Sequence, residues 1–240
     1  MNLSNIVSRI KMKLGLVNII TPIEDMDGTI VQILQDITIP VFSIYQPYKE
    51  TIHLNMQNLE LIERLDISEK YSLPDFKTRK LLYVFDVRYE SSMAAGLGFW
   101  GGGIPLSAGS TVESMLLKNA GANVMNLMIP KFTFNFTPPR EIELFHAYYS
   151  SALEFDFGFE HDKTLASIPE TARESFLELA LLDVKENLYP TLKNYSEIQT
   201  AIGTINLKID DWANAEDQRK ELINRWDDSY HLDFQPFYWA

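Results

Sequence analysis

The glycine-rich stretch at residues 96–109 holds the pattern nearest to a known chemical motif. Residues 96–101 read GLGFWG and match G-x-G-x-x-G, which in dinucleotide-binding proteins joins a strand to a helix whose N-terminus faces the pyrophosphate. Here Gly102 and Pro105 follow and oppose such a helix, and positions 114–122 contain no acidic residue that could bind the ribose. The sequence therefore predicts no nucleotide cofactor. The stretch is either an ordinary surface loop or a loop that orders on a partner, with Phe99 and Trp100 as anchors.

A second candidate for chemistry is His161, which lies between Glu160 and Asp162 and near Asp156. Carboxylate oxygens and an imidazole could join a metal site, and a metal-dependent enzyme using the acids of 154–162 is an alternative function. The simpler interpretation is a strand whose acids form a solvated outer face, because polar and apolar residues alternate along 153–160.

Other catalytic signatures are missing from the sequence. It has no cysteine, no G-x-x-x-x-G-K-[ST] motif, and no H-x-x-x-H or H-E-x-x-H pair among its four histidines. The net charge of −12 argues against a general binder of nucleic acid or of anionic membranes, and no apolar run approaches the roughly 20 residues of a membrane span. We therefore expect no enzyme activity, no cofactor and no metal.

Helices are predicted toward both ends of the chain. Apolar residues at helical spacing indicate helices at 4–14, from the capping sequence TPIE at 21–24 to about 37, and from Ser167, as the cap, to about Tyr189. The apolar stripe of the 167–189 helix is broad, so this helix should be packed on more than one side. A further helix from about Asp211 carries a seam that includes Trp212 and Trp226.

Strands are predicted in the middle of the chain. Short alternating or β-branched runs indicate strands at 41–45, 81–87, 132–137, 141–149 and 153–159, whereas residues 59–67 are ambiguous between helix and strand. We therefore expect an α+β fold, in which helices from both termini form a bundle with a central, mainly antiparallel sheet. It would be a single domain of residues 1–240, with a helical trunk at 1–40 and 167–228, a β-rich middle at 41–160 and an aromatic tail at 229–240.

Several aromatic residues are candidates for a partner interface, since Tyr, Trp and Phe make strong anchors. They are Phe99, Trp100, Trp212, Trp226, Phe234, Phe237, Tyr238 and Trp239. The C-terminal aromatics could instead tuck into their own domain. Glu154, Asp156 and Glu160 are either a plain solvated face or an acidic face that repels DNA phosphates.

The order of the predicted elements resembles that of virion neck proteins of tailed bacteriophages. The likeness lies in a first helix that ends at Leu14-Gly15, a capped second helix, a β middle, and two late helices. It extends to the style of segments such as LLDVK at 181–185 and ANAE at 213–216.

This resemblance implies a structural, ring-forming head-to-tail connector (adaptor) subunit without catalysis. Its partners would be copies of itself, the portal and other neck or tail proteins, around a channel through which DNA passes without sequence-specific binding. It would belong to the virion, assemble in the host cytoplasm and bind no membrane. A tail-side or baseplate structural protein is the alternative position.

Overall fold

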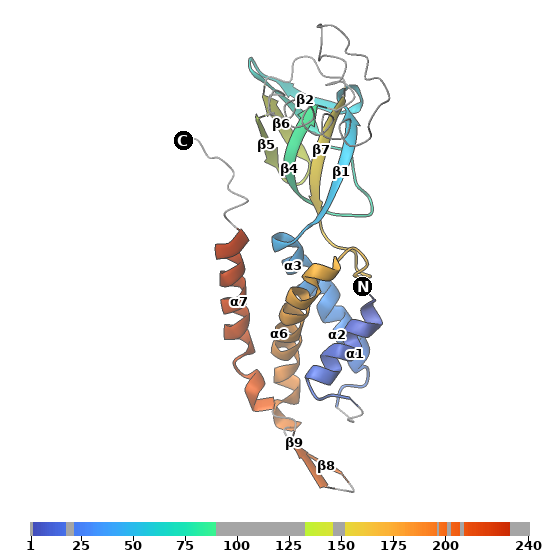
Figure 1. Cartoon of the computed structure of the whole chain (residues 1–240), viewed down its shortest axis with the longest axis vertical. Helices are drawn as coiled ribbons and strands as arrows, with labels where there is room; N and C mark the ends of the chain where they lie inside the picture. Colours follow the sequence, from blue (N-terminus) through green and yellow to red (C-terminus); the bar gives the residue numbers. More distant parts are fainter. Residues whose placement is uncertain are drawn as a thin grey trace, which may run out of the picture. The chain divides into compact units, whose positions relative to one another are not determined.

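A computed structural model describes residues 2–17, 22–89, 133–145, 152–195, 197–200, 203–206 and 209–230. It combines helices with antiparallel sheets, which confirms the predicted α+β class (Figure 1). The chain divides into two compact units, a helical unit of residues 1–48 and 160–240 and a β unit of residues 49–159. The boundaries of the β unit lie close to the predicted β-rich middle. That the whole chain forms one domain stays a prediction.

The helical unit is built around one long helix, α6 (Arg173–Leu192). Its other principal helices are α1 (Leu3–Lys13), α2 (Met26–Ile33), α3 (Ile39–Tyr45) and α7 (Ala215–Tyr230). Helix α6 contacts α1, α2 and α7, and α7 also contacts α3. Short 3-10 turns precede α6 at Glu170–Ala172, follow it at Lys193–Tyr195, and lead toward α7 at Ile209–Trp212. A small hairpin, β8 (Glu197–Thr200) and β9 (Gly203–Asn206), lies between the two long helices in sequence.

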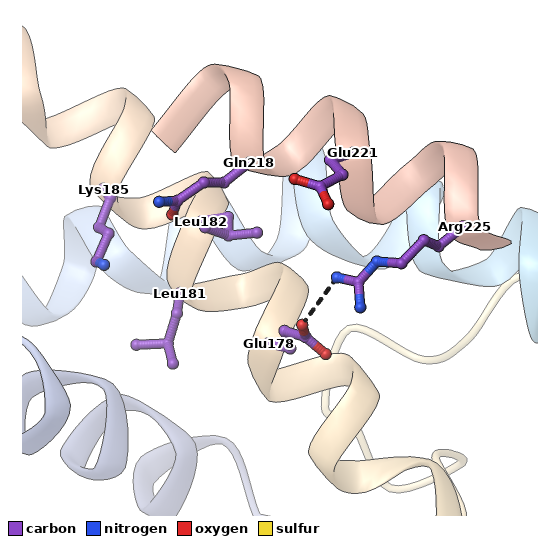
Figure 2. A pocket seen from close by; sticks show the side chains of 7 residues that line it. All are labelled: Glu178, Leu181, Leu182, Lys185, Gln218, Glu221 and Arg225. Carbon is purple, nitrogen blue, oxygen red and sulfur yellow. Dashed lines mark hydrogen bonds and ion pairs between the residues drawn. The ribbon is translucent and has the colours of Figure 1, made fainter. Parts of the chain in front are cut away.

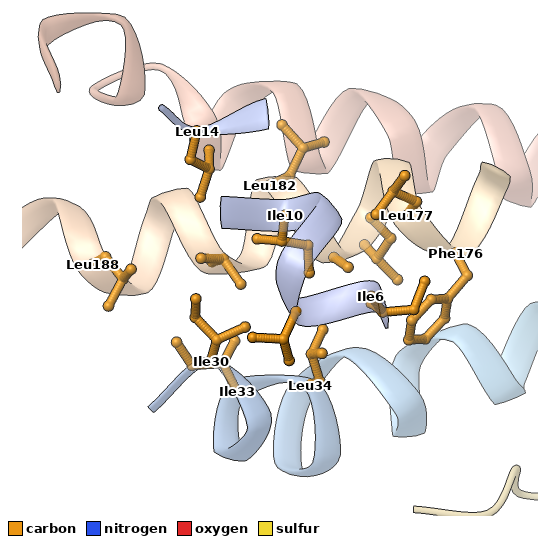
Figure 3. Packing of buried hydrophobic residues seen from close by; sticks show 14 of the residues in the cluster. Ile6, Ile10, Leu14, Ile30, Ile33, Leu34, Phe176, Leu177, Leu182 and Leu188 are labelled. Carbon is orange, nitrogen blue, oxygen red and sulfur yellow. The ribbon is translucent and has the colours of Figure 1, made fainter. Parts of the chain in front are cut away.

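The core of the helical unit is apolar and is shared by all its long helices. Figure 3 shows isoleucine and leucine side chains of α1 and α2 converging on α6. Ile10, Ile30 and Phe176 are each fully shielded from solvent. Aromatic rings add to this core, because Phe42 of α3 lies edge-on to Phe176 at 5.2 Å and close to Trp226 of α7 at 6.0 Å between ring centroids. The prediction that the 167–189 segment is packed on more than one side is confirmed.

A π-helical turn, η1 (Leu34–Thr38), joins α2 to α3. The strand predicted at 41–45 is wrong, because these residues belong to α3. A short apolar run fits a buried helix as well as a strand, and Pro40 occupies the first turn of α3 rather than ending a helix. The wider π turn upstream makes room for the proline ring, which would otherwise press on the preceding carbonyl groups.

Two predicted helix starts are also corrected. Asp25, not the 21–24 sequence, caps α2, and its carboxylate accepts the backbone N–H of Gly28 at 2.8 Å. Helix α6 begins at Arg173, after a 3-10 turn, and its N-cap residue is Ala172, which has no side chain that could cap it. The hydroxyl of Ser167 lies 2.9 Å from Nδ1 of His161. Pro190 lies inside α6, which continues to Leu192.

The β unit contains two antiparallel sheets. One has the order β1-β7-β4, formed by β1 (Tyr48–Asn55), β7 (Ala152–Phe159) and β4 (Leu81–Tyr89). The other has the order β2-β3-β6-β5, formed by β2 (Glu60–Arg64), β3 (Ser68–Ser72), β6 (Glu141–Phe145) and β5 (Thr133–Thr137). The hairpin predicted around residues 138–140 is confirmed, with Phe136 opposite Ile142. Phe155, Phe157 and Phe159 of β7 are buried, as the alternation predicts.

Candidate functional site

A buried carboxylate lies at the centre of the helical unit. Asp183 of α6 is fully shielded from solvent, and its sequence neighbours Leu182 and Val184 are buried as well. Its Oδ2 accepts a hydrogen bond from Thr38 of η1 at 2.7 Å, and its Oδ1 is 2.5 Å from Nε of Arg219 on α7. One carboxylate therefore joins the π turn, the central helix and the C-terminal helix.

The charge of Asp183 is expensive to bury and depends on these partners. Burial raises the pKa of the Asp183 carboxyl above its ordinary value, while the hydrogen bonds from Arg219 and Thr38 act to lower it. The Arg219 side chain is 21% exposed and also lies 3.6 Å from Glu186. Such a partly solvated guanidinium can neutralise the carboxylate at a smaller desolvation cost than a second fully buried ion would incur. The arrangement fixes helix position; it supplies no reacting group.

His161 forms a second buried polar cluster in the helical unit. Its Nε2 lies 2.7 Å from the carbonyl oxygen of Gln46, which can only accept, so this nitrogen carries the proton. Its Nδ1 then accepts from the Ser167 hydroxyl at 2.9 Å, and Ser43 Oγ accepts the backbone N–H of His161 at 3.0 Å. Burial lowers the pKa of His161, with the Gln46 bond and the charge of Asp162 opposing. The cluster ties together the two segments through which the chain leaves and re-enters this unit.

The predicted acidic face is partly neutralised in the β unit. Arg88 of β4 lies beside β7, with Nε 2.6 Å from Glu154 and Nη1 3.0 Å from Asp156. His53 Nδ1 is 3.6 Å from Glu154, and the Thr51 hydroxyl donates to Asp156 at 2.6 Å. The role of Glu154, Asp156 and Glu160 in repelling DNA stays a prediction, but Arg88 weakens the field that Glu154 and Asp156 can exert.

The structure separates the predicted interface residues into two groups. Trp212 and Trp226 are only 4% and 8% exposed, and both belong to the core of the helical unit. They are therefore not available as anchors for a partner, which corrects the prediction for these two indoles. The remaining candidates lie outside the described residues: Phe99, Trp100, Phe234, Phe237, Tyr238 and Trp239.

The described residues give no support to the alternative of a metal-dependent enzyme. Among the residues that the structure describes, no three His, Asp or Glu side chains come together in a way that could hold a metal ion. An open groove lies between α6 and α7 (Figure 2). Its lining consists of Glu178, Leu181, Leu182, Lys185, Gln218, Glu221 and Arg225. It offers no serine, histidine or cysteine as a nucleophile or base, and Arg225 is held 3.3 Å from Glu178.

An exposed apolar segment escaped the sequence reasoning. Leu61, Ile62, Leu65 and Ile67 are each 44–56% exposed, and all lie in the hairpin formed by β2 and β3. The signal was four large aliphatic side chains within seven residues of the segment that was ambiguous between helix and strand. Asp183 was also missed, although it falls on the apolar stripe of its helix, three residues after Ala180.

Comparison with known proteins identifies one family. A family model described as "Bacteriophage ring protein" matches residues 1–233, which cover both compact units. No curated protein matches the chain. In the part of the chain that the structure describes, none of the helices combines the length and apolar character needed to cross a membrane.

The Asp183–Arg219 pair can be tested by removing one charge or both. Arg219→Leu leaves the carboxylate buried with only Thr38 as a partner, so we expect the free energy of unfolding to fall by about 3–5 kcal/mol. The double variant Asp183→Leu/Arg219→Leu should lose less than the sum of the single losses. Urea denaturation followed by circular dichroism measures both. Lys220→Leu, which breaks an exposed pair with Glu216 on the same helix, is the matched control and should change little. If the loss in the double variant equalled the sum of the two single-variant losses, a direct interaction between Asp183 and Arg219 would be contradicted.

The His161 cluster predicts a pH dependence of stability. Because the folded-state pKa lies below the ordinary 6.5, the unfolded chain binds a proton first as the pH falls. The contribution of His161 is therefore complete above about pH 6.5 and declines below it. We expect the free energy of unfolding to fall more steeply between about pH 7 and pH 5 in the wild type than in His161→Gln. Asp183 titrates in the opposite sense but is common to both proteins. Parallel pH profiles would refute this role.

Proposed function

Because the chain belongs to the bacteriophage ring protein family, we propose that it forms the ring that connects the capsid portal to the tail. The observation that carries this proposal is the family match over residues 1–233, which makes both units part of a ring subunit. In this proposal the subunit is a structural head-to-tail connector of the virion, without catalysis. It assembles in the host cytoplasm with copies of itself, the portal and adjacent neck or tail proteins.

The distribution of charge supports a position around DNA. The helical unit has 20 Asp and Glu against 11 Lys and Arg, whereas the β unit has 13 against 10. Helix α7 exposes Asp217, Glu221 and Asp228, which form no ion pair within the described part of the chain. Lysine and arginine contacts to phosphates would hold DNA in place, whereas an acidic wall repels it. We propose that the helical unit, more than the Arg88-neutralised strands, faces the channel.

The location in the virion is the direct test. We expect an antibody or gold label on this protein to mark the junction between head and tail in purified particles. Averaged electron micrographs of the same particles should contain a ring at that level. Label at the far end of the tail would contradict the connector proposal and favour the baseplate alternative. A label on the tail side of the junction would favour a tail-terminating ring.

The channel-facing role of α7 predicts a charge-specific defect. Replacing Asp217, Glu221 and Asp228 with lysine should leave the fold and the ring intact, because all three side chains are exposed. DNA ejection should become slower or incomplete and more sensitive to ionic strength, since the new ammonium groups bind phosphates. The control replaces the same residues with asparagine or glutamine, which removes charge without creating phosphate contacts. Equal ejection rates for the lysine variant and the control, measured by release of DNA from triggered particles, would refute this orientation.

A further inference from the structure

The hairpin of β2 and β3 carries exposed apolar side chains next to an outer strand, β2, that has no further strand partner among the described residues. All five residues of β2 are exposed, including Leu61 at 44% and Ile62 at 48%. Leu65 and Ile67, at the turn, are 45% and 56% exposed. Isolated exposed aliphatic residues are normal, but four of them within seven residues on one sheet edge are typical of a protein interface.

On the other side of the same sheet, β5 has no strand partner on its outer side among the described residues, although it approaches β4 of the other sheet. In the order β2-β3-β6-β5, the outer strands among the described residues are β2 and β5. On β5, Thr133, Asn135 and Thr137 are exposed. An outer strand carries a row of backbone N–H and C=O groups without strand partners, and these can pair with another chain.

The directions of the strands make these two edges complementary. Each neighbouring pair in the sheet is antiparallel, so with four strands β2 and β5 run in opposite directions. In a cyclic ring every subunit must present two different surfaces, one to each neighbour. If rotation about the ring axis carries one sheet onto the next with little change of strand direction, β5 of one copy meets β2 of the next as an antiparallel pair.

Side-chain rows point to the same pairing. Leu61 lies opposite Tyr71, Tyr71 opposite Ile142, and Ile142 opposite Phe136. This apolar row crosses the four described strands of the sheet, with Leu61 on the outer strand β2 at one end and Phe136 on the outer strand β5 at the other. Cross-strand contacts between such side chains stabilise a sheet by about 0.2–1 kcal/mol each. If the sheet of a second copy were added at either end, the terminal side chain of this apolar row would contact an apolar side chain of that copy instead of solvent.

Features of β2 oppose indiscriminate pairing. The register with β3 shifts between Leu61 and Glu63, which marks a bulge at Ile62. Glu60, Glu63 and Arg64 place charges along the same strand. Bulges and charged side chains are common devices that keep sheet edges from adding arbitrary strands. An edge with both these devices and exposed aliphatic side chains suits one specific partner.

We propose that the β2 edge of one subunit pairs with the β5 edge of the next copy of this chain, so that the sheets join around the ring. The inference rests on the proposed ring function and adds the surface through which the ring closes. The occupant is a second copy of the chain, and each copy uses its β2 edge for one neighbour and its β5 edge for the other. A two-fold contact between two β2 edges would give only dimers.

The absence of native cysteine allows a direct cross-linking test. Glu60, Ser72, Glu141 and Thr137 form one cross-strand row, and Glu60 and Thr137 at its ends are exposed. The variant Glu60→Cys/Thr137→Cys of the full chain is assembled into particles and treated with a short bismaleimide, which tolerates an offset in register. We expect a ladder of covalent oligomers that extends well beyond the dimer, whereas each single-cysteine variant should remain monomeric.

Each outcome of this test is informative. Dimers from Glu60→Cys alone would overturn the inference in favour of a two-fold contact. A label at the head–tail junction without a ladder would overturn the edge pairing and leave the connector function standing. A ladder in particles labelled elsewhere would overturn the connector location and support the edge pairing. A chain missing from particles would overturn both.

A second pair of variants tests the apolar side chains themselves. Leu61→Glu/Ile62→Glu changes exposed residues, so its melting profile should match the wild type while its incorporation into particles falls about tenfold, or more. Ile44→Glu changes an equally exposed isoleucine, 46% accessible, in the helical unit and should assemble normally. Normal incorporation of the double variant would overturn the contribution of the hairpin.

Discussion

Helix α6 is buried on more than one side, so it is stable only where other elements surround it. Its buried residues include Phe176, Leu177 and Leu182, which face different directions around the helix axis. Leaving such a helix in water would expose several large side chains, each worth about 1.5–3 kcal/mol when buried. The N-terminal helices and α7 therefore have to meet on it, although they come from opposite ends of the chain. This constraint places the helical unit's core and brings residues 1–48 together with residues 160–240.

Apolar burial alone would not fix where α7 lies along α6. Helix α7 offers few apolar anchors, chiefly Ala215, Leu222 and Trp226. The Asp183–Arg219 pair adds a directional contact, because a shift of α7 by one turn would leave the carboxylate without its cation. A hydrogen bond from Tyr45 to Asp227 at 3.0 Å supports the same alignment near the other end of α7. A mainly polar helix can thus be held in one position while most of its surface stays charged and solvated.

The sequence predicts elements well where a periodic pattern is long, and poorly where a tertiary contact decides. The hairpin of β5 and β6 and the buried alternation of β7 follow from period-two patterns, and α6 follows from its broad stripe. Residues 41–45 lie in a helix that packs Phe42 against Phe176 of α6 and Trp226 of α7, and local propensity cannot reveal such a tertiary contact. The sequence predicts a partner interface at Trp212 and Trp226 because periodicity identifies an apolar seam. Periodicity does not show that the seam is covered by the chain's own helices. The sequence around Ser167 predicts a helix cap, but in the structure the Ser167 hydroxyl lies 2.9 Å from the buried imidazole of His161.

In the proposed ring, the helical unit and the β unit have different roles. The helical unit has an apolar core of aliphatic and aromatic side chains and holds 20 of the 33 acidic residues, which is the basis for proposing it as the wall beside DNA. In the β unit, the outer strands β2 and β5 of the four-stranded sheet have no further strand partner among the described residues, and these two strands run in opposite directions. An odd number of strands would bring parallel neighbours together under the same rotation, and parallel pairing is slightly weaker. If the sheets pair as we propose, the even number of strands among the described residues lets the same antiparallel pairing repeat at every step around the rotation axis.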